Sequence, residues 1–301
     1  MFRFRWFALA TLVALSSIAH AAPHCPGNVA SVHARHVAQY LNIVEVFINH
    51  AGPYPFLLDT GAQITSIDPA LAAALQLKPH VAGEISGVAS HEAVPLADVD
   101  DMQVGGQSIP HAQVAIQSLS RLQAADPSVR GVLGGDFLRR FDVLIDQADS
   151  LLCLGKAGEM RSHMHGDQLA FATPHSERGA ASTEPLIIPV RLSGMPEHPL
   201  LLLLDSGANA PFLWKVEEAM RTRSVTAPNI SAGQRAQPAF TILPPQDMRV
   251  GELLVHQISF AIPTAIGNAA ARIDVDGLLP TAQFRRVYID YDHRFVVLES
   301  W

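Results

Sequence analysis

The sequence predicts an all-β protein, mainly strand with a few short helices, built from two homologous lobes. Three observations predict this fold. The chain repeats itself after 146 residues, its apolar runs are short and separated by turn residues, and each half places one acid directly after such a run.

The repeat needs no gap over most of its length. Five pairs of residues share the same separation of 146 positions: Asp59 and Asp205, Gly61 and Gly207, Gly87 and Gly233, Gly105 and Gly251, and Gly131 and Gly277. We therefore expect an N-terminal lobe over residues 22–155, a polar and exposed linker over residues 156–184, and a C-terminal lobe over residues 185–301.

Short strands are expected to account for most of each lobe. One hairpin is predicted from residues 40–48 and 54–58 with its turn at 49–53, and another from residues 186–192 and 200–204. Asp68, Pro69 and the alanine-rich run behind them predict a short helix, because Asp caps a helix N-terminus and Pro fits its first turn. Residues 215–223 occupy the matching place in the second lobe.

Composition argues for a folded protein and against some partners. Apolar residues make up 49% of the 301 positions, which is enough to bury a large core. The formal net charge is -7, and the Lys and Arg residues form no basic stripe, so we expect no nucleic-acid partner. No apolar run of the mature chain is long enough for a membrane span.

Residues 1–21 have the pattern of a signal peptide. Arg3 and Arg5 give a positive start, an apolar stretch follows, and Ala19 and Ala21 form a small-x-small cleavage site. We therefore expect an exported protein, either periplasmic or secreted.

The chain has two cysteines, Cys25 and Cys153. An even pair in an exported protein favours a disulfide bond between them, and two buried thiols are the alternative.

The acid in each half follows a run that reads as a buried strand. Phe56-Leu57-Leu58 leads into Asp59-Thr60-Gly61-Ala62, and Leu202-Leu203-Leu204 leads into Asp205-Ser206-Gly207-Ala208. Burying an isolated carboxylate costs several kcal/mol unless something compensates it. Glycine allows a tight turn and a close approach, and the hydroxyl residue can tie the loop to its neighbour. Two copies suggest a carboxylate pair.

These residues resemble the retropepsin-like and pepsin-like aspartic proteases, specifically exported bacterial members with both lobes in one chain. The two acid loops match the catalytic loops of that family. Gly131-Val132-Leu133-Gly134 matches the element that crosses behind the first loop, and Gly135-Asp136-Phe137-Leu138 matches the short helix that continues it. The resemblance implies two acid-protease barrel lobes that are related by a pseudo-twofold axis. The resemblance also implies that the flap that closes over the substrate lies at Ser86, Gly87 and Val88. The corresponding segment of the second lobe lies at Ala232 and Gly233.

The sequence departs from the family pattern at two places, and each departure leads to an expectation about the site. The second crossing element, Gly277-Leu278-Leu279-Pro280, has Pro where Gly is expected, and Pro removes a hydrogen-bond donor. Ala62 and Ala208 stand where pepsins have a hydroxyl residue, so we expect the pKa values of the acid pair to be higher than in pepsins.

The resemblance implies an aspartic endopeptidase. Asp59 and Asp205 would be catalytic, sharing one proton and activating a water that hydrolyses the peptide bond, with Thr60, Gly61, Ser206 and Gly207 supporting the loops. The expected partner is a peptide or protein substrate, with no cofactor and no metal, and the repeat predicts a monomer. The alternative is a non-catalytic exported peptide-binding or sensor protein on the same fold.

Overall fold

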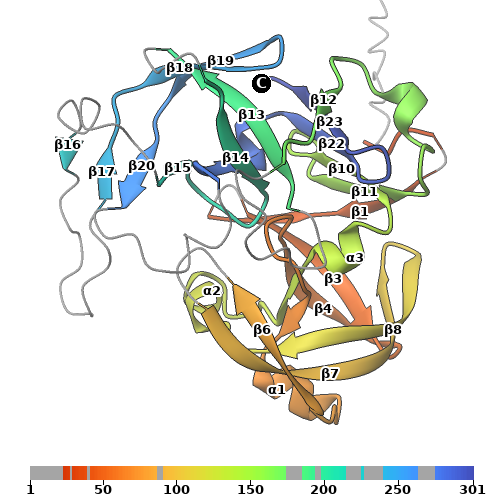
Figure 1. Ribbon diagram of the computed structural model, residues 1–301. Helices are drawn as coiled ribbons and strands as arrows, with labels where there is room; N and C mark the ends of the chain where they lie inside the picture. The colour runs from red at the N-terminus through yellow and green to blue at the C-terminus, as the bar shows by residue number, and fades with distance from the viewer. Residues whose placement is uncertain are drawn as a thin grey trace, which may run out of the picture.

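The computed structural model describes residues 23–27, 29–38, 41–86, 91–173, 185–193, 198–214, 225–226, 240–263 and 275–301. These residues form a mainly β fold of three sheets with three short α-helices (Figure 1), which confirms the expected fold at that level. None of the described helices has the length and apolar character that a membrane crossing needs.

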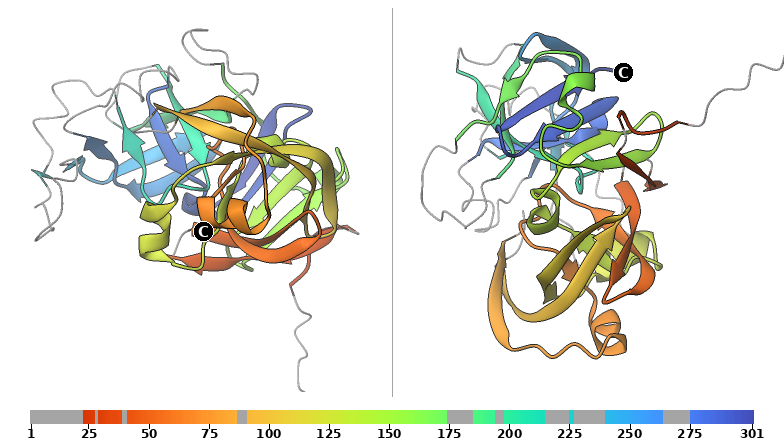
Figure 2. Two further views of the ribbon diagram at one scale, coloured as in Figure 1. Left: turned by 90° about the horizontal axis from the view of Figure 1, so that it is seen from below. Right: turned by 90° about the vertical axis from the view of Figure 1, so that its right-hand side faces the viewer.

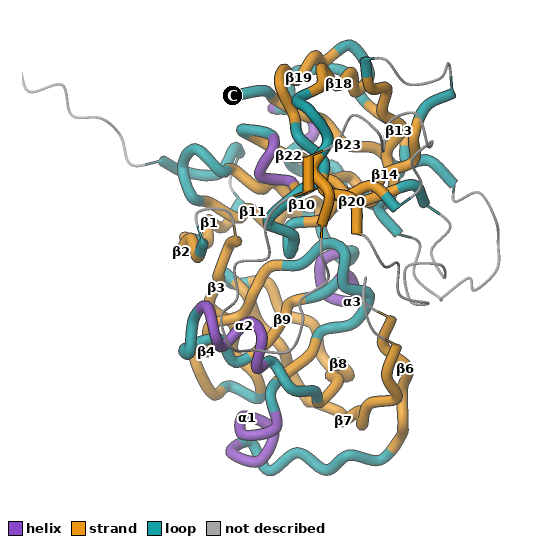
Figure 3. The backbone as a smooth tube through the Cα atoms, turned by 90° about the vertical axis from the view of Figure 1, so that its left-hand side faces the viewer, coloured by secondary structure: helices purple, strands orange, loops and turns teal. Residues whose placement is uncertain are grey.

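The eight-stranded sheet is built from the first half of the chain. Its strands are, in spatial order, β2 (Arg35–Val37), β3 (Leu41–Ile48), β4 (Ala51–Leu58), β9 (Gly131–Leu133), β5 (Ser66–Ile67), β8 (Gln107–Ile116), β7 (His91–Val104) and β6 (Val81–Ser86). The helices α1 (Pro69–Ala74), α2 (Ser120–Ala125) and α3 (Gly135–Leu138) lie in the same part of the molecule (Figure 3). Alternate residues such as Phe56 and Leu58 point into one core, as the two-residue period of a strand requires.

The nine-stranded sheet is built from the second half. Its strands are, in spatial order, β16 (Val225–Thr226), β17 (Phe240–Ile242), β20 (Ala261–Pro263), β15 (Phe212–Leu213), β21 (Gly277–Pro280), β14 (Leu200–Asp205), β13 (Ile187–Leu192), β18 (Gln246–Val250) and β19 (Leu253–Ile258). The order β13-β14-β21-β15-β20 repeats the order β3-β4-β9-β5-β8 of the first sheet. The parallel register repeats as well, because Phe56 lies opposite Gly131 and Leu202 lies opposite Gly277.

A six-stranded sheet joins the two halves. Its strands are, in spatial order, β1 (Ala30–His33), β11 (Leu151–Gly155), β10 (Asp142–Asp146), β22 (Arg286–Asp290), β23 (Phe295–Glu299) and β12 (Leu169–Ala170). The central pair, β10 and β22, is antiparallel, with Val143 opposite Ile289 and Ile145 opposite Val287. Figure 2 shows β10 and β11 beside the C-terminal strands rather than in the eight-stranded sheet. Two short 3-10 helices, η1 (Arg161–His163) and η2 (Thr281–Gln283), complete the described elements.

The turn of the first hairpin is shorter than the sequence predicts. The turn predicted at residues 49–53 begins at the right residue but is too long, because Asn49 and His50 alone make the turn and β4 already begins at Ala51. Both residues have positive φ values, 51° and 61°, which suits a two-residue hairpin loop that follows the twist of the strands. The predicted helix after Asp68 is confirmed as α1, since Asp68 accepts hydrogen bonds from the N–H groups of Ala70 and Leu71. Residues 215–223 lie outside the described residues.

The predicted linker is only partly exposed. Within its described part, residues 156–173, Met160 is buried in a small apolar cluster with Cys25, Cys153, Tyr288 and Phe295. Strand β12 pairs with β23 through Leu169 opposite Val296. The expectation of an exposed linker is therefore wrong at these places, because its few apolar side chains are drawn into the core and into the sheet.

The disulfide between Cys25 and Cys153 is present, as expected. It fastens the start of the described chain to β11, and both cysteines are buried.

Candidate active site

The Asp59 loop, residues 59–62, begins where β4 ends. Strand β4 lies between β3 and β9, and its residues Phe56, Leu57 and Leu58 are buried. Asp59 follows them directly and therefore lies at the end of a strand that is fixed in the core. The main-chain N–H of Asp59 donates to the carbonyl of Leu133 over 3.0 Å. The Asp59 Oδ1 atom accepts hydrogen bonds from the N–H groups of Gly61 and Ala62, each over 2.9 Å. The carboxylate orientation is therefore set by its own loop.

The Asp205 loop, residues 205–208, occupies the same place in the second half. Asp205 is the last residue of β14 and lies opposite Pro280 of β21 in a parallel pair. Its Oδ1 atom accepts a hydrogen bond from the N–H of Gly207 over 2.7 Å.

The two loops contact each other at their glycines. A Cβ atom added to Gly61 would lie 2.7 Å from Cγ of Asp205, and one added to Gly207 would overlap the carboxylate of Asp59. Only glycine fits at both positions, because each main chain lies directly against the acid of the other loop. The structure thus brings together Asp59, Asp205 and both glycines.

The hydroxyl residues tie the loops together reciprocally. Thr60 Oγ1 donates to the carbonyl of Leu204 over 2.9 Å and accepts from the N–H of Ser206 over 3.0 Å. Ser206 Oγ donates to the carbonyl of Leu58 over 2.8 Å and accepts from the N–H of Thr60 over 3.0 Å. All four bonds are buried and cross between the two halves of the chain.

Burial raises the pKa values of both acids of the pair. Loss of water raises the pKa of Asp205 well above its ordinary value, and the nearby charge of Asp59 raises it further. Burial also raises the pKa of Asp59, but a hydrogen bond from Asp205 and the N–H groups of Ala62 and Gly61 oppose that rise. Because the pKa values of both acids are raised, the pair favours a state in which it holds one proton.

A buried hydrogen-bond network that the sequence pattern did not predict supports the Asp59 loop from behind. The N–H of Gly134 donates to Thr65 Oγ1 over 3.0 Å, and Thr65 Oγ1 donates to Asp136 Oδ1 over 2.7 Å. The N–H groups of Thr65 and Phe137 donate to the same carboxylate oxygen. Burial raises the pKa of Asp136 despite these bonds. An acid between the apolar runs of residues 131–133 and 137–138 is the signal that could have revealed it.

The second half lacks this network as a whole. The positions that match Thr65, Gly134 and Asp136 are occupied by Pro211, Pro280 and Ala282. Pro280 has no N–H to donate, Pro211 has no hydroxyl to accept it, and Ala282 has no carboxylate. The strand register beside Asp205 is kept, and the 3-10 helix η2 follows at Thr281. Pro280 therefore removes a donor whose acceptor is also gone.

The predicted flap residues are largely outside the described part of the chain. Ser86 ends β6, where its backbone pairs with His91 of β7. Gly87, Val88, Ala232 and Gly233 lie outside the described residues.

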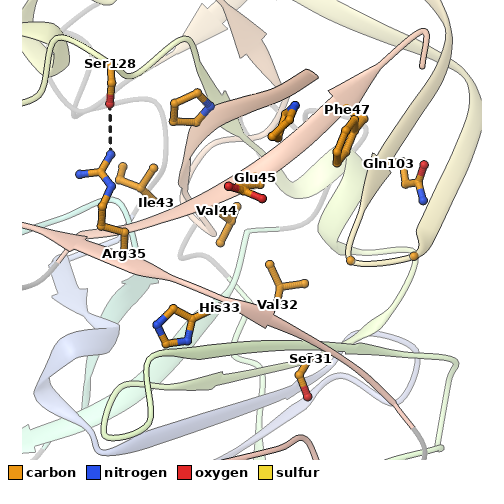
Figure 4. Close-up of a pocket in the computed structure, with 14 residues that line it drawn as sticks. Ser31, Val32, His33, Arg35, Ile43, Val44, Glu45, Phe47, Gln103 and Ser128 are labelled. Atoms are coloured by element: carbon orange, nitrogen blue, oxygen red, sulfur yellow. Dashed lines mark hydrogen bonds between the residues drawn. The ribbon is translucent and has the colours of Figure 1, made fainter. Parts of the chain in front are cut away.

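Other candidate sites are few in the part of the chain that the structure describes. It contains no group of three or more His, Cys, Asp or Glu side chains placed to hold a metal ion. A surface pocket of about 630 Å³ opens beside β1, β2 and the β3–β4 hairpin (Figure 4). Arg35 at its rim is paired with Asp126 and bonded to Ser128, and none of the predicted site residues lines it.

Comparison with protein families identifies one segment of the first half of the chain. A family model described as aspartyl protease matches residues 44–137, which include the Asp59 loop, the crossing strand β9 and Asp136. The chain therefore contains a retropepsin-like aspartyl protease domain over these residues. A search of curated proteins found no match. Asp205 lies outside the matched residues.

Proposed function

We propose that this protein is an aspartic endopeptidase whose two acids come from the two halves of one chain. The observation that carries the proposal is the contact between the Asp59 and Asp205 loops, in which each glycine lies against the opposite carboxylate. Membership of residues 44–137 in the aspartyl protease family supports peptidase activity and peptide substrates.

In the proposed mechanism the two acids begin with one proton between them. Asp59, whose Oδ1 accepts two N–H groups, takes a proton from a water, and the water oxygen attacks the scissile carbonyl carbon. Asp205 holds its proton because burial and the Asp59 charge raise its pKa, and it polarises the carbonyl oxygen. The leaving amine takes a proton from the pair as the C–N bond of the tetrahedral adduct breaks. Because water is the nucleophile, no covalent bond between the enzyme and the substrate forms.

We infer two homologous lobes, residues 22–155 and 185–301, joined by residues 156–184 and related by a pseudo-twofold axis. The repeated strand order and the repeated register of β4–β9 and β14–β21 support this inference. One chain would then supply the whole site and act as a monomer. We also propose that residues 1–21 are a signal peptide and that the protein is exported, which is consistent with the disulfide.

The alternative of a non-catalytic peptide-binding protein rests on Pro280 as a sign of lost geometry. Pro280 is not an isolated change, because Pro211 and Ala282 also replace the residues that match Thr65 and Asp136. This joint exchange weakens the alternative. Retention of both acids side by side favours the enzyme, because a binding protein has no need for two adjacent carboxyl groups that are costly to ionise together.

The test is cleavage of a peptide library by residues 22–301 in water enriched in oxygen-18. We expect new carboxyl termini that carry the heavy oxygen, and no cleavage by Asp59→Asn. The exposed Asp100→Asn variant serves as the matched control and should cleave like the wild type. A folded wild-type chain that cleaves no member of the library contradicts the proposal.

A further inference from the structure

Three aromatic side chains gather beside the Asp205 loop. Phe212 of β15 stacks on Trp214 with ring centroids 6.0 Å apart and an interplanar angle of 16°. Phe240 of β17 packs against Phe212 from another side, with centroids 5.5 Å apart and an angle of 53°. Trp214 is buried, whereas Phe212 and Phe240 remain half-buried. We call Phe212, Trp214 and Phe240 the aromatic trio.

The first half has no such trio at the matching positions. The residues 146 positions earlier are Ser66, Asp68 and Val94. Ser66 is buried and accepts a hydrogen bond from Gln117 Nε2 over 2.9 Å, and Asp68 caps α1 and pairs with Arg130. The β-sheet surroundings are nevertheless the same, since Ser66 lies opposite Val132 and Phe212 lies opposite Leu278. The two halves therefore present different chemistry at one structural position.

The trio is linked to the Asp205 loop by packing. Ala208, the last residue of that loop, packs on the same buried cluster as Phe212, and the cluster includes Trp214 and Leu278. In the first half, Ala62 packs on a cluster of Leu, Ile and Val side chains around Val132, and this cluster contains no aromatic residue. The half-exposed rings therefore lie on the Asp205 side of the site and have no counterpart on the Asp59 side.

We propose that the aromatic trio is a substrate subsite that selects an aromatic side chain on one side of the scissile bond. This inference rests on the proposed function and names its specificity. An aromatic ring entering here covers apolar surface that Phe212 and Phe240 leave exposed, and it gains edge or offset contacts with both rings. On the opposite side the matching position offers a serine hydroxyl already bonded to an amide, which gives no such gain.

The test uses pairs of peptides that differ only in Phe or Leu at one position. Their kcat/KM values are measured on residues 22–301, and their Kd values on the Asp59→Asn variant by quenching of tryptophan fluorescence. We expect Phe to be favoured by about threefold to tenfold on one side of the scissile bond, both in turnover and in binding. Phe212→Leu should reduce this Phe-to-Leu ratio to about one.

Phe171→Leu is the matched control, because Phe171 is a half-buried ring that packs on Tyr291 outside the trio. It should leave the ratio unchanged. A Phe-to-Leu ratio that survives in folded Phe212→Leu, or the absence of a ratio in the wild type, overturns the subsite. Binding with the expected ratio but without cleavage by the wild type supports the subsite and contradicts the proposed peptidase activity, so the two failures are distinguishable.

Discussion

Thr60 and Ser206 hold the two acid loops together by an exchange of four buried hydrogen bonds. Each hydroxyl accepts the main-chain N–H of the other residue and donates to a carbonyl of the strand that leads to that other residue. The position of Asp59 relative to Asp205 therefore depends on two small side chains.

Thr60→Val should lower the free energy of unfolding by roughly 2 to 6 kcal/mol. The change leaves the N–H of Ser206 and the carbonyl of Leu204 buried without a partner, and each such group costs about 1 to 3 kcal/mol. Thr281→Val is a matched control, because the Thr281 hydroxyl is buried and has no hydrogen bond among the described residues. Urea unfolding should show a change of less than about 1 kcal/mol for that control. Equal losses in both variants contradict the assigned role of Thr60.

Pro280→Gly should destabilise the protein and leave activity no higher than in the wild type. The new N–H would be buried beside Pro211, which has no hydroxyl to accept it, and the added glycine raises the entropy of the unfolded chain. We expect a loss of about 1 to 3 kcal/mol in urea unfolding. Pro245→Gly, at an exposed proline, controls for the entropy effect. An increase in peptidase rate would show that Pro280 is a defect and not one part of a joint exchange.

The dependence of activity on pH should be bell-shaped with its optimum in the mildly acidic range. Burial raises the pKa values of both acids, and Ala62 and Ala208 offer no hydroxyl to stabilise the ionised form. Ala62→Ser and Ala208→Thr add such a donor, which lowers the pKa values and moves the optimum to lower pH. Rate profiles that superimpose for wild type and variants contradict this explanation, and so does a wild-type optimum near pH 2.

Asp205→Asn should make the folded protein more stable at neutral pH. The pKa of Asp205 is raised on folding, so the folded state binds the proton more tightly than the unfolded state. The wild type is therefore most favoured at low pH and loses stability as the pH rises above 3.8, the ordinary value, toward the raised pKa. The variant lacks this loss. Urea midpoints should differ little below pH 3.8 and increasingly above it, whereas the exposed Asp100→Asn should show no such trend.

The sequence predicted what depends on local pattern and on the repeat. The strands leading to Asp59 and Asp205 follow from apolar runs, and the pairing of the two acids follows from their equal place in each half. The turn at Asn49 and His50 was predicted to extend to Pro53, because Gly52 and Pro53 are both typical of turns but lie in β4 instead. The two-residue strand β12 could not be predicted, since only its pairing with β23 holds it extended.

Contacts between residues that are far apart in the chain could not be predicted from the sequence either. Thr65 and Asp136 are 71 residues apart and meet only because β5 pairs with β9. Phe212 and Phe240 meet because β15 and β17 both pair with β20. Each of these residues is unremarkable in its own segment, and its role depends on the partner that the sheet brings to it.

The activity of Asp205→Asn tests the central claim most directly, because Asp205 lies outside the residues that match the aspartyl protease family. If the two halves of one chain form the acid pair, this variant should lose peptide cleavage by at least about a thousandfold while remaining folded and monomeric. Cleavage within about tenfold of the wild-type rate in the purified variant would contradict the claim and would place the reaction in residues 44–137 without their partner half.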